Sequence, residues 1–395
     1  MVAGGKPTNV VIGSSWGDVV AAAIFHESAA LATRLSTGRP IRAEGSVRFL
    51  TQSLREWRLM DPRGRSCPLA YRYRAEALAQ PAQLEAATLF VVGGLYGNPA
   101  ALAAVVERAA EEPGGPATVV FNGDVHWLDV DPEDFQAISE TVLAHHAIKG
   151  NVEAELASEE DAGCGCAYPD YVGDDVVDRS NQIMTRLQAT ASRFPALVGR
   201  LGDLPRYLTA SVGGRRVGIV HGDPEALAGW RLALEAMEPA DPVARRLAGW
   251  RGQPTTAADL EDWFGRADVD VFACSHTGLP YAQVVPTGGG HRLVINNGAA
   301  GLPNFAGTTH GVITRLSRDP RPPADSLHGA TIGGLRADAL PLEFDPAWWK
   351  DRFLAQWPPG SPGHRSYFSR ITRGTHLRPR QAARDGVQLT AHGGH

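Results

Sequence analysis

The sequence predicts an α/β protein whose elements form a sandwich with mixed sheets. From residue 88 onward, short apolar and β-branched runs alternate with segments of helical periodicity, a pattern typical of strands connected by helices. Three expected helices begin with a capping residue followed by proline, at Asn98-Pro99, Asp131-Pro132 and Asp223-Pro224. Gly213-Gly214 separates two strand-like runs, which predicts a hairpin and therefore an antiparallel pair in the sheet.

The elements can be placed in order from these signals. The β-branched runs predict strands at residues 88–92, 118–121, 206–212, 215–220, 269–273, 281–285, 291–295 and 310–316. The amphipathic segments that follow capping residues predict helices at residues 98–111, 131–146, 174–194, 223–237 and 255–265. The segment before residue 85 gives weaker signals, a short strand at 9–12 and an Ala-rich helix at 19–35.

The chain divides into four expected regions. They are an N-terminal extension packed on the core (residues 1–85), the core (86–318), a C-terminal extension (319–373) and a disordered tail (374–395). The proline-rich stretch after Arg318 marks the start of the C-terminal extension, which is expected to hold an edge strand at 330–344 and a docking helix within 346–373. The His-, Gly- and Arg-rich ending predicts the disordered tail.

Composition excludes several classes of protein. The chain of 395 residues is 43% hydrophobic and 21% charged, which are globular values, and its net charge of -5 gives no electrostatic case for binding double-stranded nucleic acid or an anionic membrane. There is no apolar run of roughly 18 residues or more and no signal pattern. Four cysteines make no disulfide framework in a chain of this length. We therefore expect a cytoplasmic protein with no membrane span.

Four of the expected loops begin with a polar residue of a type that binds metals. The buried run at 118–121 stops at Asn122-Gly123-Asp124, and three other strand ends resemble it. In open α/β sheets, ligands lie beyond the carboxyl ends of the strands. The four side chains are therefore expected to meet at one point, and they are Asp124, Asn151, His221 and His276. Two oxygen and two nitrogen ligands suit Mn, Zn or Fe(II), with one divalent ion per chain.

The same loops resemble a known family. The motifs, in chain order, are GGLYGNPAAL (93–102), GD (123–124), GNVE (150–153), HG (221–222), SHTG (275–278) and NNGAAGLP (296–303). Their order and spacing across roughly residues 86–316 are similar to those of the calcineurin-like metallophosphoesterases, especially the small bacterial phosphodiesterase branch. The resemblance implies a four-layer α/β/β/α sandwich with mixed sheets. It also implies metal-dependent hydrolysis of a small phosphorylated substrate or nucleotide.

The chain departs from this family at one half of the site. The family binds two metal ions bridged by the carboxylate that corresponds to Asp124. The positions of the three other ligands of one ion are Gly94, Tyr96 and Gly278 here. The ligands of the other ion are all present. The resemblance therefore implies one intact metal site beside one that has lost its ligands.

Several interpretations of the chemistry follow. In the first, a single ion polarises a phosphoryl oxygen and lowers the pKa of a bound water, while Asn98 helps to hold a phosphate at a helix N-terminus. Tyr96 would then donate to a leaving oxygen. In the second, other side chains rebuild the missing site, with candidates His126, Glu153, Asp223, Cys164 and Cys166. In the third, the protein is catalytically inactive and binds a phosphorylated ligand or partner.

The sequence leaves the roles of two further features open. Cys164 and Cys166, in the sequence GCGC, predict a soft-metal site, a redox pair or a tight loop with buried thiols. A zinc site would need Cys67 and Cys274 as well. Trp127 and Trp230 follow two of the ligands and are candidates to stack a nucleobase, although such residues more commonly pack in a core.

Overall fold

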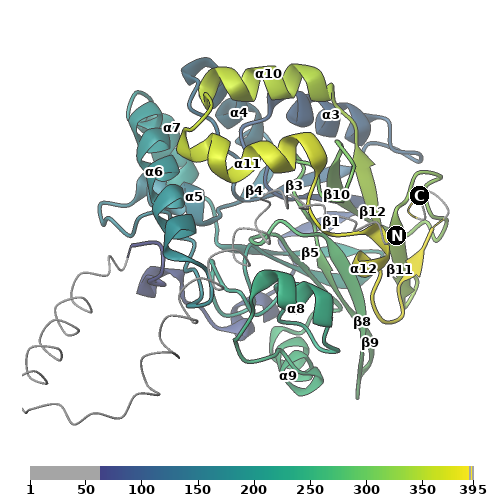
Figure 1. The fold of residues 1–395 in the computed structure, drawn as a ribbon. Helices are drawn as coiled ribbons and strands as arrows, with labels where there is room; N and C mark the ends of the chain where they lie inside the picture. The colour runs from purple at the N-terminus through teal and green to yellow at the C-terminus, as the bar shows by residue number, and fades with distance from the viewer. Residues whose placement is uncertain (1–62, 391–392, 394–395) are drawn as a thin grey trace, which may run out of the picture.

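The computed structural model describes residues 63–390 and residue 393, so the strand expected at 9–12 and the helix expected at 19–35 lie outside it. The described chain forms two mixed sheets (Figure 1). One has six strands in the order β1-β5-β6-β7-β9-β8, and the other has seven in the order β13-β11-β12-β10-β2-β3-β4.

The strands have the following bounds. The six-stranded sheet contains β1 (Leu84–Ala86), β5 (Tyr207–Val212), β6 (Arg215–Val220), β7 (Val271–Cys274), β8 (Tyr281–Thr287) and β9 (Gly290–Asn296). The seven-stranded sheet contains β2 (Thr88–Val92), β3 (Thr118–Asn122), β4 (His146–Ile148), β10 (Gly311–Ser317), β11 (His328–Ile332), β12 (Leu335–Leu342) and β13 (Gln388–Leu389).

The helices connect these strands. The α-helices are α3 (Pro99–Ala110), α4 (Pro132–Val142), α5 (Asn151–Ala157), α6 (Asp174–Ala191), α7 (Pro195–Gly202), α8 (Pro242–Ala248), α9 (Ala257–Ala267), α10 (Pro346–Gln356), α11 (Pro362–Arg373) and α12 (Pro379–Ala382). Two short 3-10 helices, η1 (Leu69–Tyr71) and η2 (Ala75–Ala79), precede β1. In the part of the chain that the structure describes, no helix is long and apolar enough to cross a membrane.

The layers follow from the two faces of each strand. In β2, Leu89 and Val91 pack between the sheets, whereas Phe90 and Val92 pack under α3 and α4. The residues of β2 are all buried, as expected of a strand covered on both faces. On the six-stranded sheet, Phe272 packs against α9. Figure 1 shows α3 and α4 on one side of the sheets and α9 on the other. The predicted four-layer α/β/β/α sandwich is confirmed.

The local signals that predicted the elements are present in the structure. The Asn98 and Asp131 side chains accept backbone N–H groups in the first turns of α3 and α4, which satisfies donors that a helix start leaves unpaired. Gly213 and Gly214 both have positive φ and join β5 to β6 as an antiparallel hairpin.

The helix predicted at 223–237 is wrong. Asp223 does accept the N–H groups of the residues two and three further on, as a cap would. However, the chain then folds back, and an added Cβ at Gly229 would lie 1.8 Å from the Asp223 carboxylate. The segment continues as turns. Its residues from 226 to 237 are largely buried on all sides, so they lack the polar face of an amphipathic helix.

Three predictions about the C-terminal part are also corrected. The strand predicted at 330–344 is a hairpin, β11 and β12, and β12 lies inside the sheet next to β10 instead of at its edge. The predicted docking helix is two helices, α10 and α11. The predicted disordered tail is ordered from residue 374 to 390, because Leu377 and Ala382 are fully buried and β13 pairs with β11.

We predict that Leu377→Ala destabilises the whole domain. Leu377 is 0% exposed in the core cluster that includes Trp263, and truncating a buried leucine costs about 2–5 kcal/mol. The free energy of unfolding, measured with denaturant, should fall by that amount. Arg380→Ala, at an exposed position of the same segment, is the control. Equal stability of the two variants would show that the segment does not belong to the folded core.

Candidate metal centre

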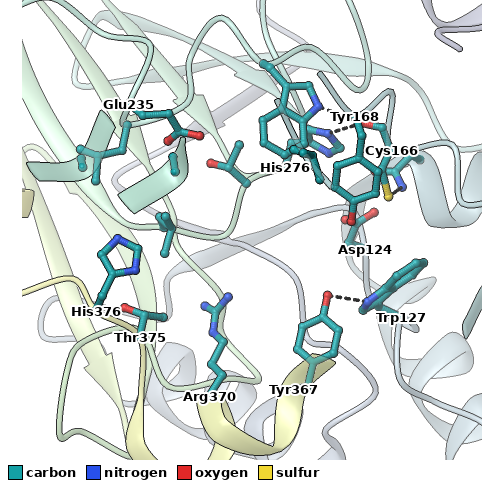
Figure 2. Close-up of a pocket in the computed structure, with 18 of the residues that line it drawn as sticks. Asp124, Trp127, Cys166, Tyr168, Glu235, His276, Tyr367, Arg370, Thr375 and His376 are labelled. Atoms are coloured by element: carbon teal, nitrogen blue, oxygen red, sulfur yellow. Dashed lines mark hydrogen bonds between the residues drawn. The ribbon is translucent and has the colours of Figure 1, made fainter. Parts of the chain in front are cut away.

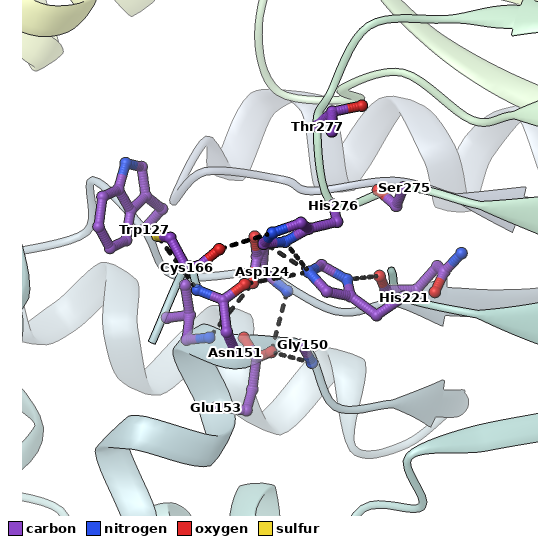
Figure 3. A network of polar contacts seen from close by, with 12 residues as sticks. Asp124, Trp127, Gly150, Asn151, Glu153, Cys166, His221, Ser275, His276 and Thr277 are labelled. Atoms are coloured by element: carbon purple, nitrogen blue, oxygen red, sulfur yellow. Dashed lines mark hydrogen bonds and ion pairs between the residues drawn. The ribbon is translucent and has the colours of Figure 1, made fainter. Parts of the chain in front are cut away.

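The four predicted ligands come from the carboxyl ends of strands in both sheets. Asp124 follows β3 and Asn151 follows β4, both in the seven-stranded sheet, whereas His221 follows β6 and His276 follows β7 in the six-stranded sheet. Figure 3 shows the four side chains converging on one point. The sandwich therefore places the site across the gap between its two sheets.

The loop after β3 is held in an unusual backbone conformation. Gly123 and Asp124 both have positive φ, 76° and 56°, and a non-glycine residue rarely adopts this region unless its surroundings fix it. The Glu153 carboxylate supplies that fixation, because it accepts the N–H groups of Asp124 at 2.9 Å, Val125 at 2.9 Å and Gly150 at 2.8 Å. Glu153 thus orients Asp124 and does not face the ligand point.

The ligand atoms are close enough to share one ion. Suitable atoms of Asp124, His221 and His276 all lie within 4.8 Å of one another. The His221 Nε2 atom lies 3.3 Å from Asp124 Oδ2, 3.2 Å from Asn151 Oδ1 and 3.2 Å from His276 Nδ1. In residues 63–390, these three His and Asp side chains make the one cluster of this kind.

Hydrogen bonds on the far side of each imidazole determine which nitrogen faces this point. His221 Nδ1 lies 2.8 Å from the carbonyl oxygen of Asn122, and His276 Nε2 lies 3.1 Å from that of Cys166. A carbonyl oxygen can only accept, so these nitrogens carry the protons. The opposite nitrogens then present lone pairs to each other and to two oxygens. A divalent cation satisfies such a set of acceptors.

The ligand side chains also shift one another's pKa values. Burial opposes ionisation of Asp124, but the nearby His221 outweighs it and holds the pKa of the carboxyl below its usual range. Burial likewise disfavours the charged form of His221, yet the Asp124 carboxylate leaves the pKa of that imidazole raised. For His276, burial and then the proximity of His221 lower the pKa to about 4. His276 is therefore neutral near neutral pH and able to bind a metal ion.

The Asn151 amide is oriented by the loop that contains the two neighbouring cysteines. Its Nδ2 atom donates to the carbonyl oxygen of Cys164 at 2.9 Å and lies 3.5 Å from Cys166 Sγ, which turns Oδ1 toward His221. Both thiols are buried, and burial raises the pKa of Cys166 well above its usual value. The pair therefore acts as a tight loop that holds a ligand, and it forms no cluster with Cys67 or Cys274 in the described chain.

The other candidates for a rebuilt second site do not face the ligand point. His126 is fully buried between Asp129 and the Ser139 hydroxyl, at 3.0 and 2.9 Å, and stacks on Phe135. The Asp223 carboxylate caps its own turn. These interactions use the polar atoms of both side chains. Neither of these two side chains is therefore placed to hold a second ion.

Both polar atoms of the Asn98 side chain are used within the fold. It is 0% exposed, its Oδ1 accepts the N–H groups of Ala100 and Ala101, and its Nδ2 donates to the carbonyl oxygen of Gly301. No polar atom of this side chain remains for a phosphate. Its role is to cap α3 and to tie that helix to the loop after β9.

The positions that correspond to the missing ligands are filled by other groups. An added Cβ at Gly94 would lie 2.6 Å from the Tyr96 ring, and one at Gly278 would lie 2.9 Å from the Tyr96 hydroxyl and 3.6 Å from Nη1 of Arg370. Tyr96 has a positive φ of 54°, so its backbone is fixed in an uncommon conformation. The phenol and a guanidinium therefore occupy the neighbourhood of the absent ligands.

A cavity opens in front of the metal ligands (Figure 2). Asp124, Asn151 and His276 line it at one end, and Glu235 and His376 lie at the other (Figure 2). Aromatic side chains line much of the wall between them: Tyr96, Trp127, Tyr168, Tyr171, Trp230 and Tyr367. Trp127 and Trp230 both line the cavity, and Trp127 is mostly buried and donates to the Tyr367 hydroxyl.

Sequence reasoning missed Arg370 and the residues around it. The motifs end near residue 316, whereas Tyr367 and Arg370 come from α11 in the C-terminal extension and project into the cavity (Figure 2). One signal was present: the buried face of α11 combines Gly363, Tyr367, Arg370 and Ile371. An arginine in the apolar stripe of a helix is unusual and indicates a specific partner.

Comparison with known proteins gives structural similarities only. No family model and no curated protein matches the chain. Among solved structures, a hypothetical protein of Pyrococcus horikoshii is 15% identical with a TM-score of 0.48, and covers 74% of this chain and 100% of its own. A metallophosphoesterase of Sphaerobacter thermophilus is 16% identical with a TM-score of 0.44, over 73% of this chain and 100% of its own.

A predicted phosphoesterase of Streptococcus pneumoniae is similar at 13% identity and a TM-score of 0.30, over 66% of this chain and 91% of its own. The fold is a four-layer sandwich with two mixed sheets. At these identities the similarities assign no activity to the chain.

We predict that Glu153→Gln weakens metal binding without removing a ligand. A glutamine amide cannot accept N–H groups with both terminal atoms, so at least one buried backbone donor loses its partner. Losing a partner that orients a ligand typically costs about 10- to 100-fold in metal affinity. Calorimetric titration with Mn should show this loss, whereas Glu159→Gln, at an exposed position of the same segment, should bind as the wild type does. Unchanged affinity in Glu153→Gln would contradict the positioning role.

We also predict that Asp124→Ala and His276→Ala each abolish binding of Mn, because either change leaves too few of the four ligands. Calorimetric titration with Mn measures this loss of binding. His291→Ala, an exposed histidine on β9, controls for loss of an imidazole. Full binding by either ligand variant would contradict the assignment of the site.

Proposed function

We propose that this protein is a metal-dependent phosphoester hydrolase that uses one divalent ion. The observation that carries the proposal is the convergence of four lone-pair ligands, from Asp124, Asn151, His221 and His276, at the wall of a cavity. The donor set fits Mn, Zn or Fe(II). Such an ion, when bound, polarises a phosphoryl oxygen and lowers the pKa of a water molecule.

The residues of the chain supply the remaining functions. Asp124 places a carboxylate beside the phosphoryl group. Asn151 and the imidazoles of His221 and His276 would fix the position of the ion relative to the substrate. The Tyr96 hydroxyl lines the same cavity. Burial keeps the pKa of Tyr96 above its usual value, so the phenol retains its proton. It can therefore donate a hydrogen bond to a leaving oxygen.

The cavity supports a small substrate with an aromatic part. Indole and phenol rings cover its wall, and Trp230 packs edge-on against the His276 ring at 5.4 Å. Flat aromatic groups such as a nucleobase stack on such rings. At the far end, the Glu235 carboxyl can accept the N–H groups of a base. A nucleotide or another small aromatic phosphoester is the substrate class that these features favour.

One observation favours a second function. The region that would hold a second ion contains the Tyr96 phenol and the Arg370 guanidinium, so a two-metal mechanism has no place for its second ion. A protein with this site could bind a phosphorylated ligand without hydrolysing it. The two functions differ in a single respect, which is turnover in the presence of metal.

The test is hydrolysis by the Mn-, Zn- or Fe-loaded protein. The substrates are p-nitrophenyl phosphate, bis(p-nitrophenyl) phosphate and a panel of nucleoside phosphates. We expect turnover that chelator abolishes. Tyr96→Phe should reduce kcat by about 100-fold, the size of a typical contribution from a proton donor, while the metal content stays unchanged. Metal binding without turnover on any substrate would favour the binding protein.

A further inference from the structure

Arg370 is a buried cation without an anionic partner. It is 3% exposed. Three other arginines are buried to a similar degree, and each pairs with a carboxylate: Arg179 with Asp175, Arg315 with Glu112 and Arg336 with Asp338. Arg370 pairs with no carboxylate of residues 63–390. Burying an unpaired charge costs several kcal/mol, so such an arginine indicates an anion that the protein chain does not supply.

The guanidinium is fixed along one edge and free along the other. Nε donates to the carbonyl oxygen of Pro303 at 2.8 Å, and Nη2 donates to that of Gly278 at 2.8 Å and lies 3.4 Å from Asn304 Oδ1. Nη1 has no hydrogen-bond partner in the described part of the chain. Because Arg370 lines the cavity (Figure 2), this free N–H edge is available to a ligand.

The guanidinium lies beside the region of the absent metal ligands. Its Nη1 atom is 3.6 Å from the position of a Cβ at Gly278, two residues after the ligand His276. The Tyr96 hydroxyl lies 2.9 Å from the same Cβ position, and Tyr96 interacts electrostatically with both Arg370 and Asp124. A phosphate placed against the four ligands would therefore have Arg370 on the side where the family has its second ion.

We propose that Arg370 forms the second half of an anion site, in which its guanidinium replaces a second metal ion and binds the phosphoryl group opposite the first ion. The proposal deepens the proposed function and rests on it for the first ion. The free Nη1 edge donates to a phosphoryl oxygen. A guanidinium stays charged and directs its N–H groups in a rigid plane, which suits phosphate oxygens.

This substitution has a consequence for specificity. A guanidinium donates hydrogen bonds to acceptor oxygens, and a phosphomonoester presents three such oxygens and a charge of about -1.5 to -2 at neutral pH, more of both than a phosphodiester. Arg370 therefore selects for a doubly charged terminal phosphate, with oxygens to share between the ion and the guanidinium. We expect phosphomonoesters to bind more tightly than phosphodiesters.

The experiment uses the full chain loaded with Mn and inorganic phosphate as the probe. We expect calorimetry to show that Arg370→Gln weakens phosphate binding roughly 10- to 100-fold, the contribution of hydrogen bonds to charged groups. The phosphate affinity of Arg370→Lys, which keeps the charge but loses the planar edge, should lie between those of the wild type and Arg370→Gln. Arg365→Gln changes an exposed arginine on the same helix and should bind phosphate as the wild type does. Mn content should be equal in all four proteins.

Because Arg370 also holds two loops together, Arg370→Gln could lose its fold. A crystal structure of the wild type with Mn and tungstate removes that ambiguity. We expect a tungstate oxygen within hydrogen-bond distance of Nη1. Tungstate that contacts the ligands but not Arg370, or phosphate affinity that is equal in wild type and folded Arg370→Gln, would overturn the proposal. Phosphate bound through Arg370 without hydrolysis of any ester would instead refute the hydrolase and leave the anion site in place.

Discussion

The hydrogen bond between His221 Nδ1 and the carbonyl oxygen of Asn122 connects the two sheets at the point on which the site depends. Asn122 is the last residue of β3 in one sheet, and His221 directly follows β6 in the other. The bond fixes the proton on Nδ1 and so directs the lone pair of Nε2 toward Asp124. A change in the packing of the sheets would therefore alter the separation of the ligands as well as the stability of the core.

The same site shows how a fixed scaffold can carry altered chemistry. The Glu153 carboxylate still binds three backbone N–H groups and still holds Asp124 in its uncommon conformation. What differs is the neighbouring volume, where glycines at 94 and 278 make room for the Tyr96 phenol and the Arg370 guanidinium. A divalent ion and a guanidinium together present less positive charge than two divalent ions. Catalysis would then rely more on the orientation of donors than on total charge.

The sequence predicted the parts of the fold whose determinants are local. Cap-plus-proline starts and the Gly213-Gly214 turn are short-range signals. The apolar runs that end at Asp124 and His221 indicate both that a strand is buried and where its carboxyl end lies. The error at 223–237 had a long-range cause, because a cap signal at Asp223 was followed by a segment buried on every side. The ordered conformation of residues 374–390 could not be predicted from local signals either, because it depends on pairing of β13 with β11 and on burial of Leu377.

The half of the site that the sequence could not predict comes from helix α11. Arg370 lies far along the chain from every recognisable motif, and only the packing of α11 against the loops around Gly278 and Pro303 brings it to the cavity. By contrast, His126 looked like a ligand because it follows Asp124 by two residues, yet its partners Asp129 and Ser139 hold it away from the site. Proximity in sequence is thus a poor guide to which side chains share a site.

We propose that the chain has one metal site and no second one. The most direct measurement is the metal content per chain, by elemental mass spectrometry of full-length protein purified without chelator and then incubated with Mn, Fe or Zn. The account predicts close to one equivalent. Two equivalents would show that Tyr96 and Arg370 do not exclude a second ion, and none with any of the three metals would show that the four converging ligands are not a metal site.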